Sequence, residues 1–219
     1  MSYSIAIDGP AGAGKSTIAK KIAKQLGCIY VDTAAMYRAM ALHILRKGIS
    51  PDDGTAISRA CEDADITLRY EKGDQVVLLN GENVNGLIRT EEVGNMASAS
   101  SVNGDVRKKM VSLQQRLSET ADVIMDGRDI GTCVLPHADV KVYLTADSKV
   151  RAKRRYDELK QKGSECDLYK IEQDIMERDE RDMNREISPL RQAEDAVLLD
   201  SSDLTVDEVV EKIIGLVKR

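Results

Sequence analysis

Gly9-Pro10-Ala11-Gly12-Ala13-Gly14-Lys15-Ser16 decides the fold of this chain. The stretch has the pattern GxxxxGK(S/T), follows a short apolar run at residues 4–7 and leads directly into a helical pattern. The backbone N–H groups of such a loop point inward around phosphate oxygens, and the N-terminus of the following helix adds partial positive charge. The stretch therefore predicts a nucleoside triphosphate site at a strand-to-helix junction.

The loop also predicts roles for its own side chains. We expect Lys15 to reach the β- and γ-phosphates of ATP, Ser16 to place its hydroxyl on Mg²⁺, and Thr17 to support the α-phosphate side. The loop alone does not separate a kinase from a GTPase switch or a motor ATPase. The D-x-x-G and N-K-x-D patterns of a GTPase do not occur in the sequence, and a motor ATPase usually works inside a larger assembly, so a kinase is favoured. The residues predicted to bind ATP are Gly9, Pro10, Ala11, Gly12, Ala13, Gly14, Lys15, Ser16 and Thr17.

Short apolar runs alternate with amphipathic helical patterns along the chain, and this alternation predicts an α/β fold with a parallel sheet. The first helical pattern stops at Gly27, and the last opens with Thr205 and Glu208 in capping-box spacing. The five expected buried strands are residues 4–7, 28–31, 123–125, 140–144 and 196–199.

Residues 66–90 have a different pattern, in which apolar and polar residues alternate with a period of two. Two expected tight turns, Lys72-Gly73-Asp74 and Asn80-Gly81, interrupt this pattern. Strands joined so closely cannot belong to a βαβ crossover, so we expect a small antiparallel meander. It lies inside an insert predicted to span about residues 39–97.

Composition and charge limit the partners. The formal net charge of -5 argues against general nucleic-acid binding, which requires a basic surface. The N-terminus has neither a charged leader nor a long apolar run, and no stretch approaches the roughly 18 to 20 apolar residues that span a bilayer, so a cytoplasmic location is expected. The four cysteines are widely separated and, with only two histidines, make a poor zinc site, so Mg²⁺ is the expected metal.

Charged residues follow two more of the expected strands, at the edge where ligands of parallel sheets bind. Arg38 lies one turn into the helix after the second strand. After the third strand the chain reads Asp126-Gly127-Arg128-Asp129. Asp126 is expected to hold Mg²⁺ through water, Arg128 to meet phosphate, and Asp129 to accept a hydrogen bond from a base amino group.

The helical pattern from about residue 168 to 185 changes character along one face. Leu168, Ile171 and Ile175 form an apolar stripe, and the same spacing continues into Arg178, Asp182 and Arg185. Charges left in a dry core cost several kcal/mol, so we expect this half of the stripe to border a polar cleft or an ion-pair network. The alternative for any one of these residues is a solvated helix face with i,i+4 ion pairs.

A basic run precedes Gly163-Ser164 and contains Lys149, Arg151, Lys153, Arg154 and Arg155. Taken alone, it is more typical of a solvated helix face. Beside a phosphate loop, it suggests a lid of about residues 148–167 that closes arginines over the triphosphate, with Arg154 in a catalytic role. Several converging arginines suit phosphoryl transfer, which spreads negative charge over the migrating group.

The chain resembles the bacterial cytidylate kinase family over essentially its whole length, in the motifs IDGPAGAGKST, VDTAAMYR, LIRTEEVGNMAS, MDGRDIGT and ERDERDMNR. The resemblance implies a three-layer P-loop kinase fold, with a five-stranded parallel sheet, a small antiparallel monophosphate-binding insert and a helical lid. It implies a monomer that transfers the γ-phosphoryl group of ATP to CMP or dCMP with Mg²⁺ present. Lys15, Arg128, Arg154 and Arg185 are the expected catalytic residues.

The same resemblance implies an acceptor site. Ser98, Arg107 and Asp129 match the cytosine-recognising group, Arg38, Arg128 and Arg185 match the monophosphate-binding arginines, and Arg178 and Asp182 match positions at the sugar. Thr33 is expected to join them. The family commonly reads Asp-Ser-Gly-Ala where this chain reads Asp32-Thr33-Ala34-Ala35, which leaves the choice between CMP and dCMP open. A kinase for another small acceptor, such as UMP, AMP or shikimate, and an ATP-binding regulatory module are the alternatives.

Overall fold

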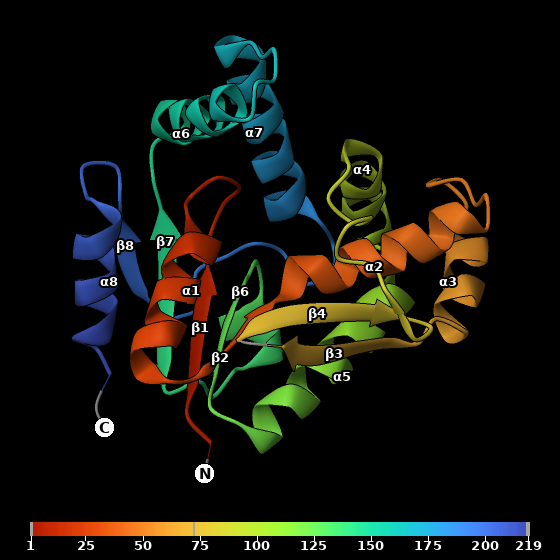
Figure 1. Cartoon of the computed structure of the whole chain (residues 1–219), viewed down its shortest axis with the longest axis horizontal. Helices are drawn as coiled ribbons and strands as arrows, with labels where there is room; N and C mark the ends of the chain where they lie inside the picture. Colours follow the sequence, from red (N-terminus) through yellow and green to blue (C-terminus); the bar gives the residue numbers. More distant parts are fainter. Residues whose placement is uncertain (1, 72, 218–219) are drawn as a thin grey trace.

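The structure is a computed structural model that describes residues 2–71 and 73–217; Lys72, in the first turn predicted for the meander, lies outside the described residues. Its centre is a five-stranded parallel sheet with strand order β2-β6-β1-β7-β8 (Figure 1). This sheet confirms the predicted fold class, and its strands match the five predicted apolar runs to within about two residues at each end. The strands are β1 (Ser4–Asp8), β2 (Ile29–Asp32), β6 (Val123–Gly127), β7 (Val140–Thr145) and β8 (Val197–Asp200).

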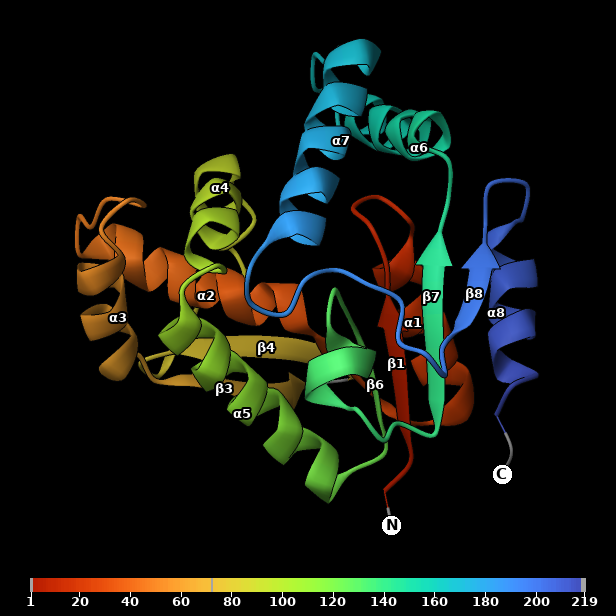
Figure 2. The same ribbon diagram turned by 180° about the vertical axis from the view of Figure 1, so that it is seen from behind.

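Helices cover both faces of this sheet, which gives three layers (Figure 2). On one face α1 (Lys15–Leu26) and α8 (Val206–Ile214) pack over Ile5, Ile7 and Ile124. On the other face α2 (Thr33–Arg46) and α5 (Gly104–Thr120) pack over Ala6, which points away from its two neighbours. A strand buried on both faces needs apolar residues at successive positions, and this is why the strands appear as continuous apolar runs in the sequence.

The ends of the helices follow the expected chemistry. Gly27 ends α1 in a left-handed conformation with φ 69°, and Thr205 and Glu208 form a reciprocal capping box at the start of α8. Asp32 begins α2 by accepting a hydrogen bond from the N–H of Ala35.

The segment between α2 and α5 contains α3 (Gly54–Glu62), a three-stranded antiparallel sheet and α4 (Glu91–Ser100). The small sheet confirms the predicted meander, and its strands are β3 (Ile66–Glu71), β4 (Asp74–Leu79) and β5 (Glu82–Asn83). Val77 and Leu79 of β4 belong to the same hydrophobic cluster as Val31 of the main sheet. The insert is therefore packed against the main core, and its predicted limits, 39 and 97, fall inside α2 and α4.

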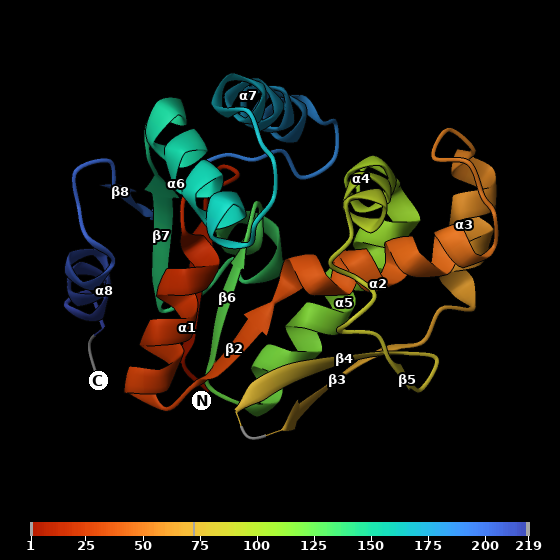
Figure 3. The same ribbon diagram turned by 45° about the horizontal axis from the view of Figure 1, so that its top comes forward.

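Helices α6 (Ser148–Gln161) and α7 (Leu168–Asn184) pack together and lie beyond the carboxyl ends of the parallel strands (Figures 1 and 3). The prediction of a core-facing apolar stripe on this helix is wrong at its start: Leu168 is 42% exposed, whereas Ile175 is buried. The reason is position, because the first turn of α7 extends past the sheet and away from the core. The remaining element is η1 (Ile130–Val134), one π-helical turn that follows β6.

Among the described residues, no helix is both long and apolar enough to cross a bilayer. The carboxyl ends of β1, β2, β6 and β7 lie along one edge of the sheet, because these strands are parallel. The phosphate loop, the start of α2, the Arg128-Asp129 turn and the start of α6 therefore gather at this edge.

Candidate active site

The phosphate loop joins β1 to α1 in the middle of the sheet. Gly9 has φ 149°, and a Cβ atom at this position would lie 1.9 Å from the carbonyl oxygen of Leu144 on β7. Only glycine permits this approach of the two backbones. Gly14, with φ 86°, precedes α1 directly, so the free N–H groups of the helix N-terminus open toward the loop.

Lys15 lies inside the loop and is buried. Its Nζ donates to the carbonyl oxygens of Gly9 at 2.8 Å and Pro10 at 2.7 Å. Burial lowers the pKa of Lys15 well below its ordinary value, and the nearby charge of Arg128 lowers it further. A bound polyanion would relieve both effects, since it supplies the opposite charge.

Asp126, at the end of β6, accepts two hydrogen bonds from side chains on different elements. The hydroxyl of Ser16 donates to Oδ2 at 2.8 Å, and the hydroxyl of Tyr30 on β2 donates to Oδ1 at 2.7 Å. Burial raises the pKa of Asp126, and the neighbouring charge of Asp32 raises it further. The two residues predicted to serve the metal thus lie in direct contact.

This pair fits Mg²⁺, which prefers oxygen ligands and is usually bound through one or two carboxylates plus substrate phosphates. The hydroxyl of Ser16 and the carboxylate of Asp126 supply hard oxygen donors beside the phosphate loop. No group of three or more His, Cys, Asp or Glu side chains that could hold a metal occurs within residues 2–71 and 73–217. The two side chains could supply part of a Mg²⁺ coordination shell, and the phosphates of a nucleotide could supply the rest.

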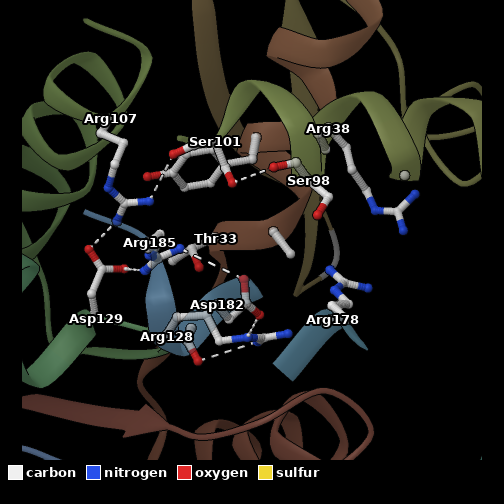
Figure 4. Close-up of a pocket in the computed structure, with 15 residues that line it drawn as sticks. Thr33, Arg38, Ser98, Ser101, Arg107, Arg128, Asp129, Arg178, Asp182 and Arg185 are labelled. Carbon is white, nitrogen blue, oxygen red and sulfur yellow. Dashed lines mark hydrogen bonds and ion pairs between the residues drawn. The ribbon is translucent and has the colours of Figure 1, made fainter. Parts of the chain in front are cut away.

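A pocket lies beside the loop, and it is lined by α2, α4, α5, the turn after β6 and the end of α7 (Figure 4). The structure brings together all nine residues predicted for the acceptor. They are Thr33, Arg38, Ser98, Arg107, Arg128, Asp129, Arg178, Asp182 and Arg185.

One end of the pocket is built around Asp129, which is buried. Its carboxylate accepts a hydrogen bond from Arg107 and lies 3.6 Å from Nη2 of Arg185. Arg107 also donates to the carbonyl oxygen of Ser101 at 3.2 Å and lies over the ring of Tyr37. This end offers a carboxylate held between two guanidinium groups, an arrangement that could recognise a polar ring.

The other end holds a second ion pair. Nε of Arg128 donates to the carboxylate of Asp182 at 2.7 Å, and Nη1 of Arg185 lies 3.9 Å from the same carboxylate. The neighbouring charges of Arg128, Arg178 and Arg185 lower the pKa of Asp182, although burial acts against them. Arg128 and Arg178 also lower the pKa of Lys15 through their charges, so this end of the pocket lies close to the phosphate loop.

The pocket carries more positive than negative charge. Five arginines and two aspartates line it, an excess of three positive charges. Burial lowers the pKa of Arg178 to about 10, and the charge of Arg128 contributes. Within the described part of the chain, Nε of Arg178 and Nη2 of Arg185 are buried without a hydrogen-bond acceptor. Buried donors of this kind are costly unless a ligand uses them, so the pocket is suited to an anion.

Arg38 and Thr33 both come from α2. Nη1 of Arg38 donates to the carbonyl oxygens of Ile88 at 2.9 Å and Thr90 at 3.3 Å. A Cβ atom on Gly94 of α4 would lie 3.0 Å from Nη2 of Arg38, so this glycine makes room for the guanidinium. The hydroxyl of Thr33 donates to the carbonyl oxygen of Asp126 at 2.6 Å and so ties α2 to the end of β6.

The chain is similar to known proteins over nearly its whole length. Residues 5–219 match the family model described as cytidylate kinase. The chain belongs to the cytidylate kinase family. It is 51% identical to the cytidylate kinase of Caldicellulosiruptor bescii over 97% of this chain and 94% of that protein. It is 45% identical to the cytidylate kinase of Shouchella clausii over 99% of this chain and 96% of that protein.

Among solved structures, a gluconokinase from Sinorhizobium meliloti 1021 has a similar fold, with a TM-score of 0.50 and 15% identity over 98% of this chain and 91% of that one. At this identity the likeness concerns the fold alone. Membership of the cytidylate kinase family rests on the family model and the curated relatives.

Two of the four residues predicted for catalysis lie outside the lining of the pocket in this cytidylate kinase family member: Lys15, at the phosphate loop, and Arg154, on α6. Arg154 is half-buried, and its guanidinium donates to the carbonyl oxygen of Ser201 at 2.6 Å and to the hydroxyl of Ser201 at 3.2 Å. In this structure it therefore joins α6 to the segment after β8.

Sequence reasoning missed several residues around the loop. Tyr30 was read only as part of an apolar strand. Arg151 belongs to a basic run expected either on a solvated helix face or in a lid, and in the structure it is buried against Asp179 of α7. Asp8 is buried at the end of β1 and accepts from the N–H groups of Ile130 at 2.8 Å and Gly131 at 2.7 Å. For Asp179 a signal existed, since it lies one helical turn after the buried Ile175.

Proposed function

We propose that the protein transfers the γ-phosphoryl group of ATP to CMP or dCMP and releases ADP with CDP or dCDP. Membership of the cytidylate kinase family supports this activity. The single observation that carries the proposal is the position of the arginine-rich pocket, whose lining includes Gly127 and Arg128 directly after Asp126, the residue that contacts Ser16 of the phosphate loop. A kinase that joins two nucleotides needs both sites within reach of one phosphoryl group.

On the acceptor side, the pocket residues divide by chemistry. Asp129 and Arg107 offer an acceptor and donors to the amino, ring nitrogen and carbonyl groups of cytosine, and Ser98 lies in the same lining. Arg38, Arg128 and Arg185 bind the monophosphate, because guanidinium groups match phosphate oxygens in geometry and charge. Arg178 and Asp182 face the sugar, together with Thr33.

On the donor side, the backbone of residues 9–17 binds the phosphates of ATP, and Lys15 moves from its loop carbonyls to the β- and γ-phosphates. Ser16 and Asp126 would hold Mg²⁺, Asp126 through water. When bound, Mg²⁺ neutralises charge on the β- and γ-phosphates. The oxygen of the acceptor phosphate attacks, so no side chain needs to form a covalent bond.

The arginines supply the transition-state stabilisation. Negative charge spreads over the migrating phosphoryl group, and each charge-assisted hydrogen bond contributes about 1.5 to 3 kcal/mol. Arg128 and Arg185 reach this group from the acceptor side. Arg154 and the rest of segment 148–167 act as a lid that excludes water when the cleft is closed. Arg154 must leave Ser201 to take this role.

The experiment is a coupled ADP-release assay with ATP, Mg²⁺ and each of CMP, dCMP, UMP, AMP and GMP. We expect CMP and dCMP to give the highest kcat/KM. Highest activity on UMP, AMP or GMP would overturn the acceptor assignment. Slow ADP release at a rate that does not change with any acceptor would favour a regulatory ATP-binding module. A monomeric state and a cytoplasmic location stay predictions.

A further inference from the structure

A buried ion pair joins the two helices beyond the sheet to the phosphate loop. Nη1 of Arg151, on α6, donates to Oδ2 of Asp179, on α7, at 2.5 Å. The two side chains are 9% and 8% exposed. Neither residue lines the acceptor pocket. Arg151 lies within the proposed lid segment, but the mechanism above gives neither side chain a role of its own.

Both members of this pair also bind the same residue of the loop. The N–H of Ala11 donates to Oδ1 of Asp179 at 2.9 Å, and Nη1 of Arg151 donates to the carbonyl oxygen of Ala11 at 2.8 Å. The three residues therefore close a ring of hydrogen bonds. Nε of Arg151 donates to the carbonyl oxygen of Ala146 at 2.8 Å, and this hydrogen bond fixes the orientation of the guanidinium group.

The next loop residue is packed just as closely. A Cβ atom on Gly12 would lie 3.3 Å from Cβ of Arg151 and 3.7 Å from Cδ1 of Ile175. Gly12 has φ 76°, a left-handed conformation that other residues rarely adopt. The tip of the loop is thus held by hydrogen bonds at Ala11 and by packing at Gly12.

General stability does not explain this arrangement. A buried ion pair often stabilises a protein no more than apolar side chains of similar volume would, because both charges lose their water. A carboxylate beside a triphosphate site also repels the ligand unless an arginine neutralises it. Apolar residues could not replace the pair in one respect: its side chains form hydrogen bonds with both the N–H and the carbonyl oxygen of Ala11.

We infer that Arg151 and Asp179 are positioning residues that hold the phosphate loop of the nucleotide-free enzyme in its ATP-binding conformation. The inference rests on the proposed function only in taking ATP as the ligand of the loop. The pair acts through Ala11 and Gly12, and it makes α6 and α7 part of the donor site.

The main test is a double variant, Arg151→Met/Asp179→Leu, which removes both charges and so keeps the net charge and leaves no unpaired buried ion. Two quantities are measured without an acceptor: the Kd of MgATP by calorimetry, and amide hydrogen exchange in peptides that cover residues 5–14. We expect a Kd for MgATP raised about tenfold and loop exchange faster by a similar factor. The Kd of CMP, measured without ATP, should change less than twofold.

Asp179→Asn provides a second test, because a positioning role and a purely electrostatic effect predict opposite changes in the Kd of MgATP. The asparagine keeps an oxygen for the N–H of Ala11 but loses the charge that holds Arg151, so we expect a smaller rise in the Kd of MgATP, about threefold. Charge alone predicts the opposite result, since removing a carboxylate next to a polyanion would tighten binding. Tighter MgATP binding by Asp179→Asn would therefore overturn the inference.

The matched control is Arg46→Met/Glu82→Leu, which removes an exposed pair between α2 and β5 with hydrogen bonds of 2.6 and 3.0 Å. It should leave both Kd values and the loop exchange unchanged. The inference fails if Arg151→Met/Asp179→Leu behaves like this control, or if it weakens ATP and CMP equally, which would indicate general damage. Because ATP binding is measured without an acceptor, a wrong acceptor assignment would leave this result standing.

Discussion

The hydroxyl of Ser16 lies 2.8 Å from Oδ2 of Asp126, although the two residues are 110 positions apart in the chain. The contact joins the first turn of α1 to the end of β6, where the carboxyl ends of the parallel strands meet. It places a hydroxyl and a carboxylate beside the phosphate loop, where Mg²⁺ bound to a triphosphate would need its protein ligands.

Asp126→Asn tests this site. The variant keeps the size of the side chain but loses the charge, so the Mg²⁺ concentration for half-maximal rate should rise by about tenfold or more. Burial already raises the pKa of Asp126, so the neutral variant should unfold at no lower urea concentration than the wild type. A Mg²⁺ titration at saturating ATP and CMP measures the effect. Tyr30→Phe, which removes one hydrogen bond to the same carboxylate, should give a smaller shift. An unchanged titration in Asp126→Asn would exclude the residue from the metal site.

Lys15→Ala tests the donor side. Loss of the ammonium group should lower kcat by about 10² to 10³, since a charge aimed at the migrating phosphoryl group is removed. The fold should persist, because a buried cation with a lowered pKa contributes little to stability. Steady-state kinetics and circular dichroism check the two statements. Unchanged kcat in a folded variant would remove Lys15 from the mechanism.

Asp129→Asn tests recognition of the base. The variant loses the charge that holds Arg107 and Arg185, so the KM for CMP should rise by about 10- to 100-fold while the KM for ATP stays within about twofold. Asp195→Asn is the matched control, because it also breaks an ion pair between a carboxylate and a cation, here Lys141. Asp195 does not line the pocket, and its side chain is 65% exposed. Equal losses for both substrates in Asp129→Asn would argue against a base-specific role.

Asp8 makes stability depend on pH. Burial raises the pKa of Asp8 from 3.8 to about 6, against the hydrogen bonds from Gly131 and Ile130. Between these values the folded state keeps a proton that the unfolded chain releases, so the contribution is present at low pH and is lost as the pH rises through about 6. Relative to Asp8→Asn, the wild type should lose about 2 to 3 kcal/mol of unfolding free energy between pH 4 and pH 7.

Urea unfolding of the two proteins across this range measures that difference. Asp195 provides a control with the opposite pH dependence. A hydrogen bond from Lys141 lowers the pKa of Asp195, so its contribution to stability is lost as the pH falls. A difference between wild type and Asp8→Asn that does not change with pH would show that Asp8 has an ordinary pKa.

Local patterns made much of this structure predictable. The glycine-rich loop, the apolar strands and the period-two meander each depend on a few neighbouring residues, and the structure contains all three. The gathering of Arg38, Arg128 and Asp182 in one pocket was predicted too, because parallel strands place their carboxyl ends together and the motifs resembled a known family. Which of these residues contacts ATP or CMP remains a prediction.

The missed features depend on contacts between distant segments. Helical spacing shows which residues share a face, but not whether another element covers that face. Leu168 is therefore exposed although the stripe predicts that it faces the core, and Arg151, expected on a solvated face or in a lid, is buried. Tyr30 was missed for a similar reason: its ring belongs to the strand pattern, and only the fold brings its hydroxyl to Asp126.

Neighbouring positions on α7 face different parts of the site: Arg178 lines the acceptor pocket, and Asp179 accepts a hydrogen bond from Ala11 in the phosphate loop. A helix turns about 100° per residue, so α7 can do this only in one register. Inserting a single residue between Asp179 and Asp182 would rotate Asp182 and Arg185 out of the pocket while Asp179 stayed in place. The turn at residues 162–167 carries no such constraint. Natural length variation in this part of the chain should therefore be confined to that turn, and α7 should tolerate substitutions on its outer face but no insertions or deletions.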